Sequence, residues 1–470
     1  MLNTLNDALN NIDNFIWGMP LIVLILFTGI LLTVRLRGLQ VRHLGKALHY
    51  VFHNEDDGEG EVTSFGALCT ALSATIGTGN IVGCATAIVA GGPGALFWMW
   101  LAAFFGMATK YAEGMLAVKY RVIAEDGHAL GGPFYYIEKG MGKNFKWLAK
   151  LFCVFGTMVG LFGIGTFTQV NGITSAVNNF FDPSNVHTIS LFGMNYSISV
   201  VVAGIIVTVC AGLVIIGGIK RISKVSEVIV PFMAVTYIGV CLIIVFTHLP
   251  QVPAAFVQIV QSAFGLKAAA GGAIGAMTVA MQKGIARGIF SNEAGLGSAP
   301  IAAAAAQTKE PVRQGLVSMT GTFIDTIIIC TMTGLSIVLT GAWQVEGIEG
   351  VQVTTYAFQH GLPFPAKFTA FVLMLCLVFF AFTTILGWDY YSERCLEYLT
   401  NGHKKKIIVY RWLYIIAVFI GPYMTVSAVW TIADIFNGLM AIPNMIALFA
   451  LSGVVAKEAK DFFKAEKHKL

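Results

Sequence analysis

The chain has 470 residues, of which 56% are hydrophobic and 12% are charged, and its mean hydropathy is +0.74. Soluble domains carry about 25% charged residues, so the polar surface is too small for the ~3 soluble domains that the length would suggest. The composition also excludes a disordered chain, a collagen and a disulfide-knotted secreted domain. It indicates a polytopic membrane protein, and the 51 glycines are typical of membrane helices that pack closely or break.

The formal net charge of +5 does not indicate a nucleic-acid partner, because the basic residues are divided among short segments between apolar runs. The eight cysteines lie in or beside apolar runs without a Cys-x-x-Cys pair, so neither a zinc site nor a disulfide framework is indicated. The sequence has no phosphate-binding loop and no Gly-x-Ser-x-Gly or HExxH motif. We therefore expect neither transport driven by ATP nor an enzyme.

Eleven apolar runs are long enough to cross a bilayer, which takes about 20 residues. They lie at 16–36, 62–91, 93–121, 148–182, 195–217, 224–248, 268–290, 312–341, 366–392, 407–424 and 428–456. The fourth run exceeds the thickness of the bilayer, so we expect it to tilt or project. Shorter helices, at the surface or re-entrant, are expected at 37–53, 252–264 and 296–306.

Lysine and arginine predict the orientation of these spans. They gather in the segments 36–61, 121–147, 217–225, 282–313 and 393–406 and in the C-terminal tail, whereas the opposite face carries only Lys267 and Lys367. Basic loops face the cytoplasm, so we expect the N-terminus outside and the C-terminus inside the cell (plasma or inner) membrane. The basic amphipathic stretch RLRGLQVRHLGKALHYVF is expected to lie along the inner surface as a tether, with a regulatory lipid site as the alternative.

Glycine clusters suggest that two spans are broken helices. One cluster is Ser73–Asn80 in the second span, and the other is Gly271–Ala276 in the seventh. Each span opens a block of five, and consecutive blocks of five have opposite topology, which is the pattern of an inverted-repeat transporter with its site near the midplane. The alternative is close helix packing through small residues. The predicted units are 1–61, 62–248, 249–456 and 457–470, namely the N-terminal span with the amphipathic helix, two five-helix repeats and a cytoplasmic tail.

Polar residues inside other spans are further candidates. Gln169 and Asn171 could face a zwitterionic ligand or form a hydrogen bond between helices. The adjacent hydroxyls of Thr383 and Thr384 suit a small hard cation, although each could instead bond to its own helix. Trp388 follows Thr384 by four residues on the same helical face, where it could cap a pocket or pack at an interface.

Charged residues inside a membrane are costly and are usually functional. Asp325 and Asp434 lie well inside their spans and could relay protons or pair with polar neighbours. Lys110 and Glu113, three residues apart, are expected to form an ion pair. A last group is interpreted as a gate or hinge at the inner end of the seventh span, with an ordinary helix cap as the alternative. Its members are Arg287, Asn292 and Glu293.

Several stretches resemble landmarks of the alanine or glycine:cation symporter family, also called sodium:alanine symporters. They are ATIGTGNIVG at 74–83, GGPGALFWMW at 91–100, GGPFYYIEKG at 131–140, ARGIFSNEAGLGSAPIAAAAA at 286–306 and TTILGWDYY at 383–391. The resemblance implies an all-α polytopic protein with the LeuT-like 5+5 inverted repeat, preceded by one extra N-terminal helix. It also implies co-transport of sodium with an amino acid.

The resemblance further implies a role for individual residues. The substrate-binding residues would be Thr75, Gly77, Thr78, Gly79, Gln169, Gly272, Ala273, Gly275 and Trp388. The sodium ligands would be carbonyls near Ser73 and Ile76 and the hydroxyls of Thr383 and Thr384, with Asn80 as a further candidate. Some family members carry a bulky aromatic residue where this chain has Ala273, which implies room for side chains larger than alanine.

Together these features predict a sodium-coupled symporter that imports a small neutral amino acid, alanine or glycine first, by alternating access. The first alternative is the same architecture importing glutamine or another larger neutral amino acid. The second is coupling to protons through Asp325 or Asp434, and a channel or receptor is the last. The expected partners are the amino acid, the sodium ion and the lipid bilayer, with no nucleic acid and no ATP.

Overall fold

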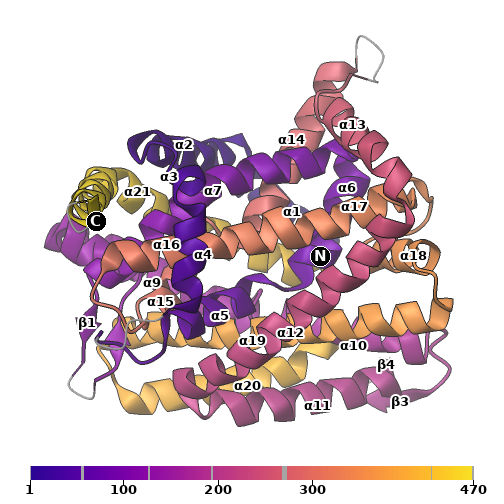
Figure 1. The fold of residues 1–470 in the computed structure, drawn as a ribbon. Helices are drawn as coiled ribbons and strands as arrows, with labels where there is room; N and C mark the ends of the chain where they lie inside the picture. Colours follow the sequence, from indigo (N-terminus) through magenta and orange to yellow (C-terminus); the bar gives the residue numbers. More distant parts are fainter. Residues whose placement is uncertain are drawn as a thin grey trace.

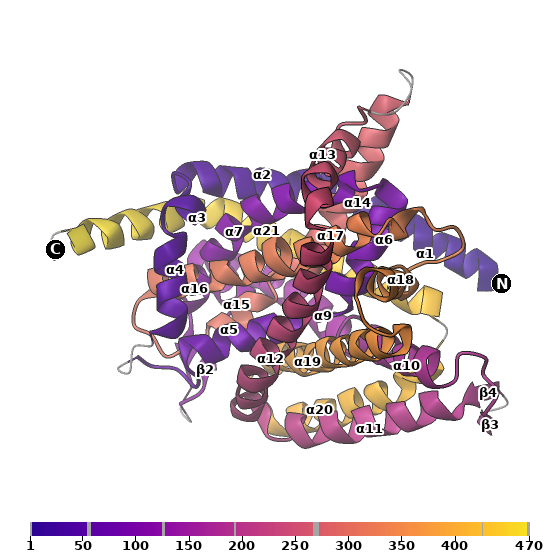
Figure 2. The ribbon, with the colours of Figure 1, turned by 45° about the vertical axis from the view of Figure 1, so that its right-hand side comes forward.

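The computed structural model describes residues 2–53, 58–124, 127–191, 194–266, 272–424 and 426–467. Within these ranges the protein is almost entirely helical, and Figure 1 shows long helices that run across the whole body. The two sheets are antiparallel hairpins: β1 (Val122–Ile123) pairs with β2 (Ala129–Leu130), and β3 (Thr188–Leu191) pairs with β4 (Met194–Ser197). Figure 2 shows the start of the first helix and the end of the last helix at opposite ends of the molecule.

Helices coincide with all eleven predicted spans. In chain order they are α2 (Met19–Arg35), α5 with α6 (Ser64–Thr75, Cys84–Gly91), α7 (Gly94–Lys119), α9 with α10 (Lys146–Phe162, Phe167–Phe181), α11 (Ile198–Ile215), α12 (Gly218–Thr247), α14 (Ala273–Asn292), α16 with α17 (Pro311–Thr322, Thr331–Leu339), α19 (Ala366–Thr400), α20 (Lys404–Ile420) and α21 (Val426–Lys467). The shorter helices are α1 (Leu2–Ile16), α3 (Leu39–Arg42), α4 (Leu44–Phe52), α8 (Pro133–Tyr135), α13 (Val252–Ala263), α15 (Ala299–Ala303) and α18 (Val351–Gly361).

Eight helical segments of the described chain are long and apolar enough to cross a membrane, and the bent pair of α5 and the segment 79–91 makes a ninth. The helices α7 and α14 complete the predicted eleven, but charged residues reduce their apolar character. Lys110 and Glu113 lie in α7, and Lys283 and Arg287 lie in α14. The expected short helices at 37–53, 252–264 and 296–306 correspond to α3 and α4, to α13 and to α15.

That the long fourth span tilts or projects stays a prediction. The segment Lys143–Phe181 is long and apolar enough to cross a membrane, and it is interrupted between α9 and α10. Gly163 and Thr166 leave helical geometry there. The interruption packs closely on α19: a Cβ on Gly165 would lie 2.7 Å from the Cβ of Trp388, and the Tyr414 hydroxyl donates to the Gly165 carbonyl at 2.7 Å. A glycine is therefore needed where this turn meets the helix that carries Trp388.

The break predicted at Gly271–Ala276 is wrong for the described residues. Gly271 lies outside them, and α14 runs without interruption from Ala273, with the amide of Ala276 already donating to the Gly272 carbonyl at 2.9 Å. The chain leaves the helix later, over 293–298, before α15 begins. Figures 1 and 2 show α13 and the first part of α14 together, standing out from the body.

The two broken spans are held together at the end of the molecule that carries the C-terminus. Val62, just before α5, bridges to Ala306, just after α15, in a parallel pairing. The guanidinium of Arg121 donates to four backbone carbonyls on the two segments, at 2.5 to 2.9 Å. These carbonyls belong to Glu59, Ala304, Ala306 and Thr308. We call this set of contacts the Arg121 clasp.

Candidate functional site

The first break follows α5 and turns the span by 54°. Ile76 has an extended backbone after Thr75, and helical geometry resumes at Gly79 in a π-helical turn, Gly79–Gly83, which continues into α6. The freed amide of Gly77 donates to the Asn80 side-chain oxygen at 2.9 Å. This bond satisfies a backbone donor that lipid could not satisfy.

Asn80 also ties the first break to the rest of the molecule. Its amide nitrogen donates to the Asp325 carboxylate at 2.7 Å. Asp325 accepts two further hydrogen bonds, from the hydroxyl of Ser291 at 2.9 Å and from that of Thr326 at 2.7 Å. Ser291 lies in the last turn of α14, so a single buried carboxylate connects both broken spans. Of the two roles considered for Asp325, the geometry has it paired with polar neighbours.

Of the residues expected to bind sodium, Ile76, just after α5, and Thr384 of α19 come together. The Thr384 hydroxyl lies 3.4 Å from the Ile76 carbonyl oxygen and 3.0 Å from that of Phe380. The Thr383 hydroxyl also lies 3.0 Å from the Phe380 carbonyl, but it faces the Met233 sulfur of α12 at 3.7 Å. The Ser73 hydroxyl donates to its own helix, at Thr70. Thr384 and Ile76 thus bring two oxygens together from different elements, and oxygens are the ligands that a small hard cation prefers. The Thr383 and Ser73 hydroxyls bond to their own helices, which is the alternative considered for the threonines.

Gln169 of α10 faces the first break from another side. Its side-chain oxygen lies 3.4 Å from the backbone nitrogen of Thr78, which donates to it. The space between α5, α10 and α19 is narrow: a Cβ on Gly77 would lie 2.6 Å from the Thr384 hydroxyl and 3.4 Å from the Gln169 oxygen. A Cβ on Gly79 would instead touch Ser291 of α14 at 3.5 Å. Gly77 thus has no side chain where three elements approach one another.

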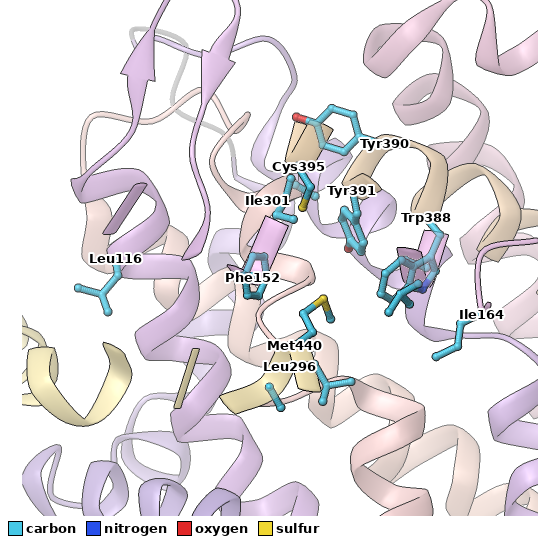
Figure 3. Close-up of a cluster of buried hydrophobic side chains, with 14 of the residues drawn as sticks. Leu116, Phe152, Ile164, Leu296, Ile301, Trp388, Tyr390, Tyr391, Cys395 and Met440 are labelled. Carbon is cyan, nitrogen blue, oxygen red and sulfur yellow. The ribbon is translucent and has the colours of Figure 1, made fainter. Parts of the chain in front are cut away.

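The second break begins at Glu293, which has a left-handed backbone with φ of 56°. The Glu293 carboxylate accepts from the Trp388 indole at 3.0 Å and from the Ser298 hydroxyl at 2.5 Å. Figure 3 shows Trp388 and Tyr391 of α19 in the buried cluster that also contains Leu296 of this break. Trp388 therefore holds the second break through a hydrogen bond as well as by packing.

Two further side chains satisfy the unwound backbone at Gly295. Its amide donates to the Glu113 carboxylate of α7 at 3.1 Å, and its carbonyl accepts from Asn444 of α21 at 2.9 Å. Asn444 also donates to Glu113 at 2.7 Å and accepts from the Tyr136 hydroxyl. The Glu113 carboxylate therefore binds to the second break and to the asparagine that holds it.

The predicted ion pair between Lys110 and Glu113 is not formed in the described structure. The Lys110 ammonium is buried without a hydrogen-bond partner, and it lines a cavity of about 20 Å³ with Thr75 and Asn292. That volume is enough for one water molecule. The two residues share a helical face, but the attachment of Glu113 to Gly295 and Asn444 takes its carboxylate away from the lysine.

Three residues predicted to bind substrate do not reach this region. Gly272 and Gly275 are exposed, Ala273 is half-exposed, and a Cβ on Gly275 would meet nothing within 4 Å. Ala273 is 18 residues before Ser291, a rise of about 27 Å along α14. The implied effect of Ala273 on substrate size therefore has no basis in the described structure.

Arg287 lies apart from Asn292 and Glu293, so the predicted gate group is divided. Arg287 lines a cavity of about 100 Å³ with Asp13 and Asp434, beside Trp17. Asn292 instead donates to the Thr326 hydroxyl at 3.0 Å. The reason is their spacing: Arg287 precedes Asn292 by five residues in α14, which turns the two side chains about 140° apart around the helix axis. Lys283 and Arg287 precede the break, whereas Lys309 and Arg313 follow α15, so the four do not belong to one basic segment.

Sequence reasoning missed several residues that complete these networks. Phe380 contributes a backbone carbonyl, which no side-chain pattern reveals, and Asn444 pairs with residues more than 140 positions away. Ser291 stands beside Asn292 in a motif that was noticed, yet it was not singled out. Asn171, which was considered, is half-exposed, and its side-chain oxygen accepts from the Ser175 hydroxyl of the same helix.

Comparison with known proteins shows the family. The model of the sodium:alanine symporter family matches residues 2–470. An uncharacterized transporter of Haemophilus influenzae is 55% identical, covering 98% of this chain and 97% of its own length. The sodium/alanine symporter AgcS of Methanococcus maripaludis is 45% identical over 98% of both chains. The probable sodium/glutamine symporter GlnT of Bacillus subtilis is 39% identical over 97% of this chain and 90% of its own length.

A solved structure shows the fold. MhsT in complex with L-phenylalanine superposes with a TM-score of 0.54 at 12% identity, covering 86% of this chain and 99% of its own. The predicted fold class, an all-α polytopic membrane protein of the LeuT-like type, is confirmed. The exact repeat boundaries at 62–248 and 249–456 stay a prediction. Because family members are symporters and not enzymes, the protein is a membrane transporter, and the chain belongs to the sodium:alanine symporter family.

Proposed function

We propose that the protein imports a small neutral amino acid, alanine or glycine first, together with sodium. The observation that carries this proposal is the meeting of the Ile76 carbonyl with the Thr384 hydroxyl, 3.4 Å apart, beside the amide of Thr78. Oxygen ligands for a cation and a half-helix end whose amides would bind a carboxylate thus adjoin the same break. These amides, of Gly77 and Thr78, donate to Asn80 and Gln169 in this arrangement. The name of AgcS, a sodium/alanine symporter, supports alanine and sodium by analogy.

The arrangement favours a neutral substrate. Asn80, Gln169 and Thr384, the side chains that bond to the first break, are uncharged. The nearby carboxylates of Asp325 and Glu293 are each engaged by at least two donors within the protein. A zwitterion needs both of its charges satisfied, and here the amides near Thr78 and the sodium ion would meet its carboxylate.

Coupling follows from the shared break. Sodium bound between Ile76 and Thr384 would join α5 to α19, and the amino acid bound at Thr78 and Gln169 would join the same break to α10. Each ligand would then favour the arrangement that binds the other, which is a positive coupling free energy. Alternating access would follow from rocking of the broken spans, with the N-terminus outside and the C-terminus in the cytoplasm of the cell membrane.

Uptake into proteoliposomes tests this function. Labelled alanine should accumulate with an inward sodium gradient and should not do so when potassium replaces sodium. Accumulation driven by a pH gradient without sodium would identify proton coupling instead. Competition with unlabelled glycine, glutamine and phenylalanine distinguishes a site for small amino acids from the glutamine alternative suggested by GlnT. Uptake that does not saturate would indicate a channel.

The variant Thr384→Ala tests the sodium site. It should raise the sodium concentration for half-maximal uptake, while Thr384→Ser should restore it. Thr369→Ala is the matched control, because Thr369 is buried in the same helix and its hydroxyl bonds only to its own backbone, at Ala366. An identical sodium dependence in Thr384→Ala and in the control would overturn the assignment of this site.

A further inference from the structure

A basic cleft lies at the end of the molecule that carries the C-terminus. It has a volume of about 770 Å³ and is lined by the turn between α2 and α3 on one side and by the last turns of α21 on the other. Figure 2 shows the end of α21 extending past the body beside α3. Two contacts fix the walls to each other: Arg35 donates to the Ser452 hydroxyl at 2.7 Å, and the His43 ring stacks on Phe463 with centroids 4.0 Å apart.

The cleft carries more positive than negative charge. Six exposed cationic side chains line it from two segments more than 400 residues apart, and none of them forms an ion pair within the described residues. They are Arg35, Arg37, Arg42, Lys457, Lys460 and Lys464. The acidic lining residues are Asp461 and Glu466, and Glu466 is paired with Lys46.

The positive charges around the cleft affect the protonation of His43, which also lines it. Burial lowers the pKa of the His43 imidazole, and the charges of Arg42 and Lys46 lower it further, against the opposing effect of Glu466. The positive charge is therefore concentrated rather than dispersed along the chain. Like charges held this close repel one another, so an anion placed among them would be stabilised.

The cleft also adjoins an apolar surface. Val34 at the end of α2 and Val41 in α3 are 68% and 66% exposed. The candidate span Thr431–Glu466 is about 54 Å long at 1.5 Å per residue, and the hydrocarbon core is about 30 Å thick. The span is therefore long enough for its last turns to pass beyond the hydrocarbon and to carry their lysines at headgroup level, next to apolar side chains that acyl chains can cover.

We propose that this cleft binds the phosphate headgroup of an anionic phospholipid of the adjacent leaflet. Arg35, Arg37 and Arg42 would contact the headgroup from one wall and Lys457, Lys460 and Lys464 from the other, while acyl chains lie along Val34. A free phosphate offers the same charge but no acyl chains, so it would leave the apolar edge uncovered. A bound lipid would cross-link the helix that precedes the first repeat to the helix that ends the second.

Thermal unfolding of the purified full-length protein in detergent tests the proposal. Phosphatidylglycerol added to the micelles should raise the unfolding temperature in a saturable way, whereas phosphatidylcholine or inorganic phosphate should not. The variant Arg37→Gln/Arg42→Gln/Lys460→Gln should need about a hundredfold more phosphatidylglycerol, since each basic residue near an anionic surface contributes about a fivefold factor.

The matched control is Lys220→Gln/Lys405→Gln/Lys406→Gln, which removes three exposed basic residues outside the cleft. It should keep the lipid dependence of the unaltered protein. Equal weakening in both triple variants, full stabilisation by inorganic phosphate, or no preference for phosphatidylglycerol over phosphatidylcholine would overturn the proposal. If the cleft variant is unstable without lipid, the single substitutions Arg37→Gln, Arg42→Gln and Lys460→Gln replace it, each with about a fivefold effect expected.

Discussion

The amide of Asn80 donates to the carboxylate of Asp325 at 2.7 Å, across 245 positions of sequence. This bond joins the first broken span to the eighth span, and Ser291 extends the connection to α14 through the same carboxylate. The Asp325 side chain is completely buried, so its negative charge depends on these donors for stabilisation. If either break changes its conformation during transport, the Asp325 carboxylate must therefore keep its hydrogen-bond donors or acquire new ones.

Replacing Asp325 by asparagine should impair both stability and transport. The amide oxygen can keep the two hydroxyl donors, Ser291 and Thr326, but the new NH2 group would face the NH2 group of Asn80. Buried donors left unsatisfied cost about 1–3 kcal/mol each. We expect a lower unfolding temperature and strongly reduced uptake at saturating sodium. Asp7→Asn, at an exposed position of α1, is the control. Normal uptake by Asp325→Asn would show that the carboxylate charge is dispensable.

Gln169→Ala should lower substrate affinity by about tenfold, for the loss of one hydrogen bond of about 1–1.5 kcal/mol. Gln169→Leu should do at least as much harm, because it fills the space with apolar atoms. Expression and unfolding temperature should stay near those of the unaltered protein. Asn171→Ala, two residues away and half-exposed, should leave affinity unchanged. Substrate titration by competition uptake measures the effect, and equal affinities in all variants would make Gln169 a packing residue.

Gly77→Ala and Gly275→Ala should have opposite effects. The new methyl at residue 77 would lie 2.6 Å from the Thr384 hydroxyl, so it should destabilise by about 1–3 kcal/mol and raise the sodium requirement. At residue 275 it would meet nothing within 4 Å, and alanine favours a helix by about 1 kcal/mol. Unfolding temperature and sodium titration give both readouts. A loss of transport in Gly275→Ala alone would restore that residue to the binding site.

Trp388→Phe should weaken the attachment of the second break to α19. Phenylalanine keeps an aromatic ring but lacks the indole N–H that donates to Glu293 at 3.0 Å. We expect a double-mutant cycle with Glu293→Gln to give a coupling energy of about 1–3 kcal/mol in unfolding, as for other buried hydrogen-bonded pairs. The cycle Trp388→Phe with Ser392→Ala is the comparison, since the Ser392 hydroxyl donates to backbone carbonyls of its own helix and not to a group that the indole contacts. A coupling energy near zero for Trp388 and Glu293 would show that Trp388 stabilises the second break by packing and not through this hydrogen bond.

The sequence predicted the spans and the first break, but it placed the second break wrongly. The three interruptions of long spans each contain a Gly-x-Gly: Gly77-Thr78-Gly79, Gly163-Ile164-Gly165 and Gly295-Leu296-Gly297. The second break was predicted at 271–276 because that stretch contains three glycines. A glycine by itself, however, only lowers helix stability by about 1 kcal/mol. The position of the second break follows from backbone conformation, because Gly295 and Gly297 have φ of 96° and 82°, which a helix does not allow.

What the sequence could not predict is which side chains satisfy the unwound backbone. Glu113 and Asn444 meet at Gly295 from helices more than 300 residues apart, and no spacing rule reports such a meeting. The spacing of Lys110 and Glu113 predicts an ion pair, but the Glu113 carboxylate instead accepts hydrogen bonds from Gly295 and Asn444, which are distant in sequence. Polar residues inside apolar runs and the family resemblance thus pointed to Thr384 and Gln169, while the tertiary arrangement determined the partners of the charged residues.

The Arg121 clasp is one part of a wider attachment between the two segments. Three of its four carbonyls lie on 304–308 and one, that of Glu59, lies on the other segment, while the backbone amides of Glu61 and Val62 bond directly across. Loss of the guanidinium would therefore leave the two segments joined by backbone hydrogen bonds. Closure at this end of the molecule is thus shared between one side chain and the main chain, and a single substitution should weaken it without abolishing it.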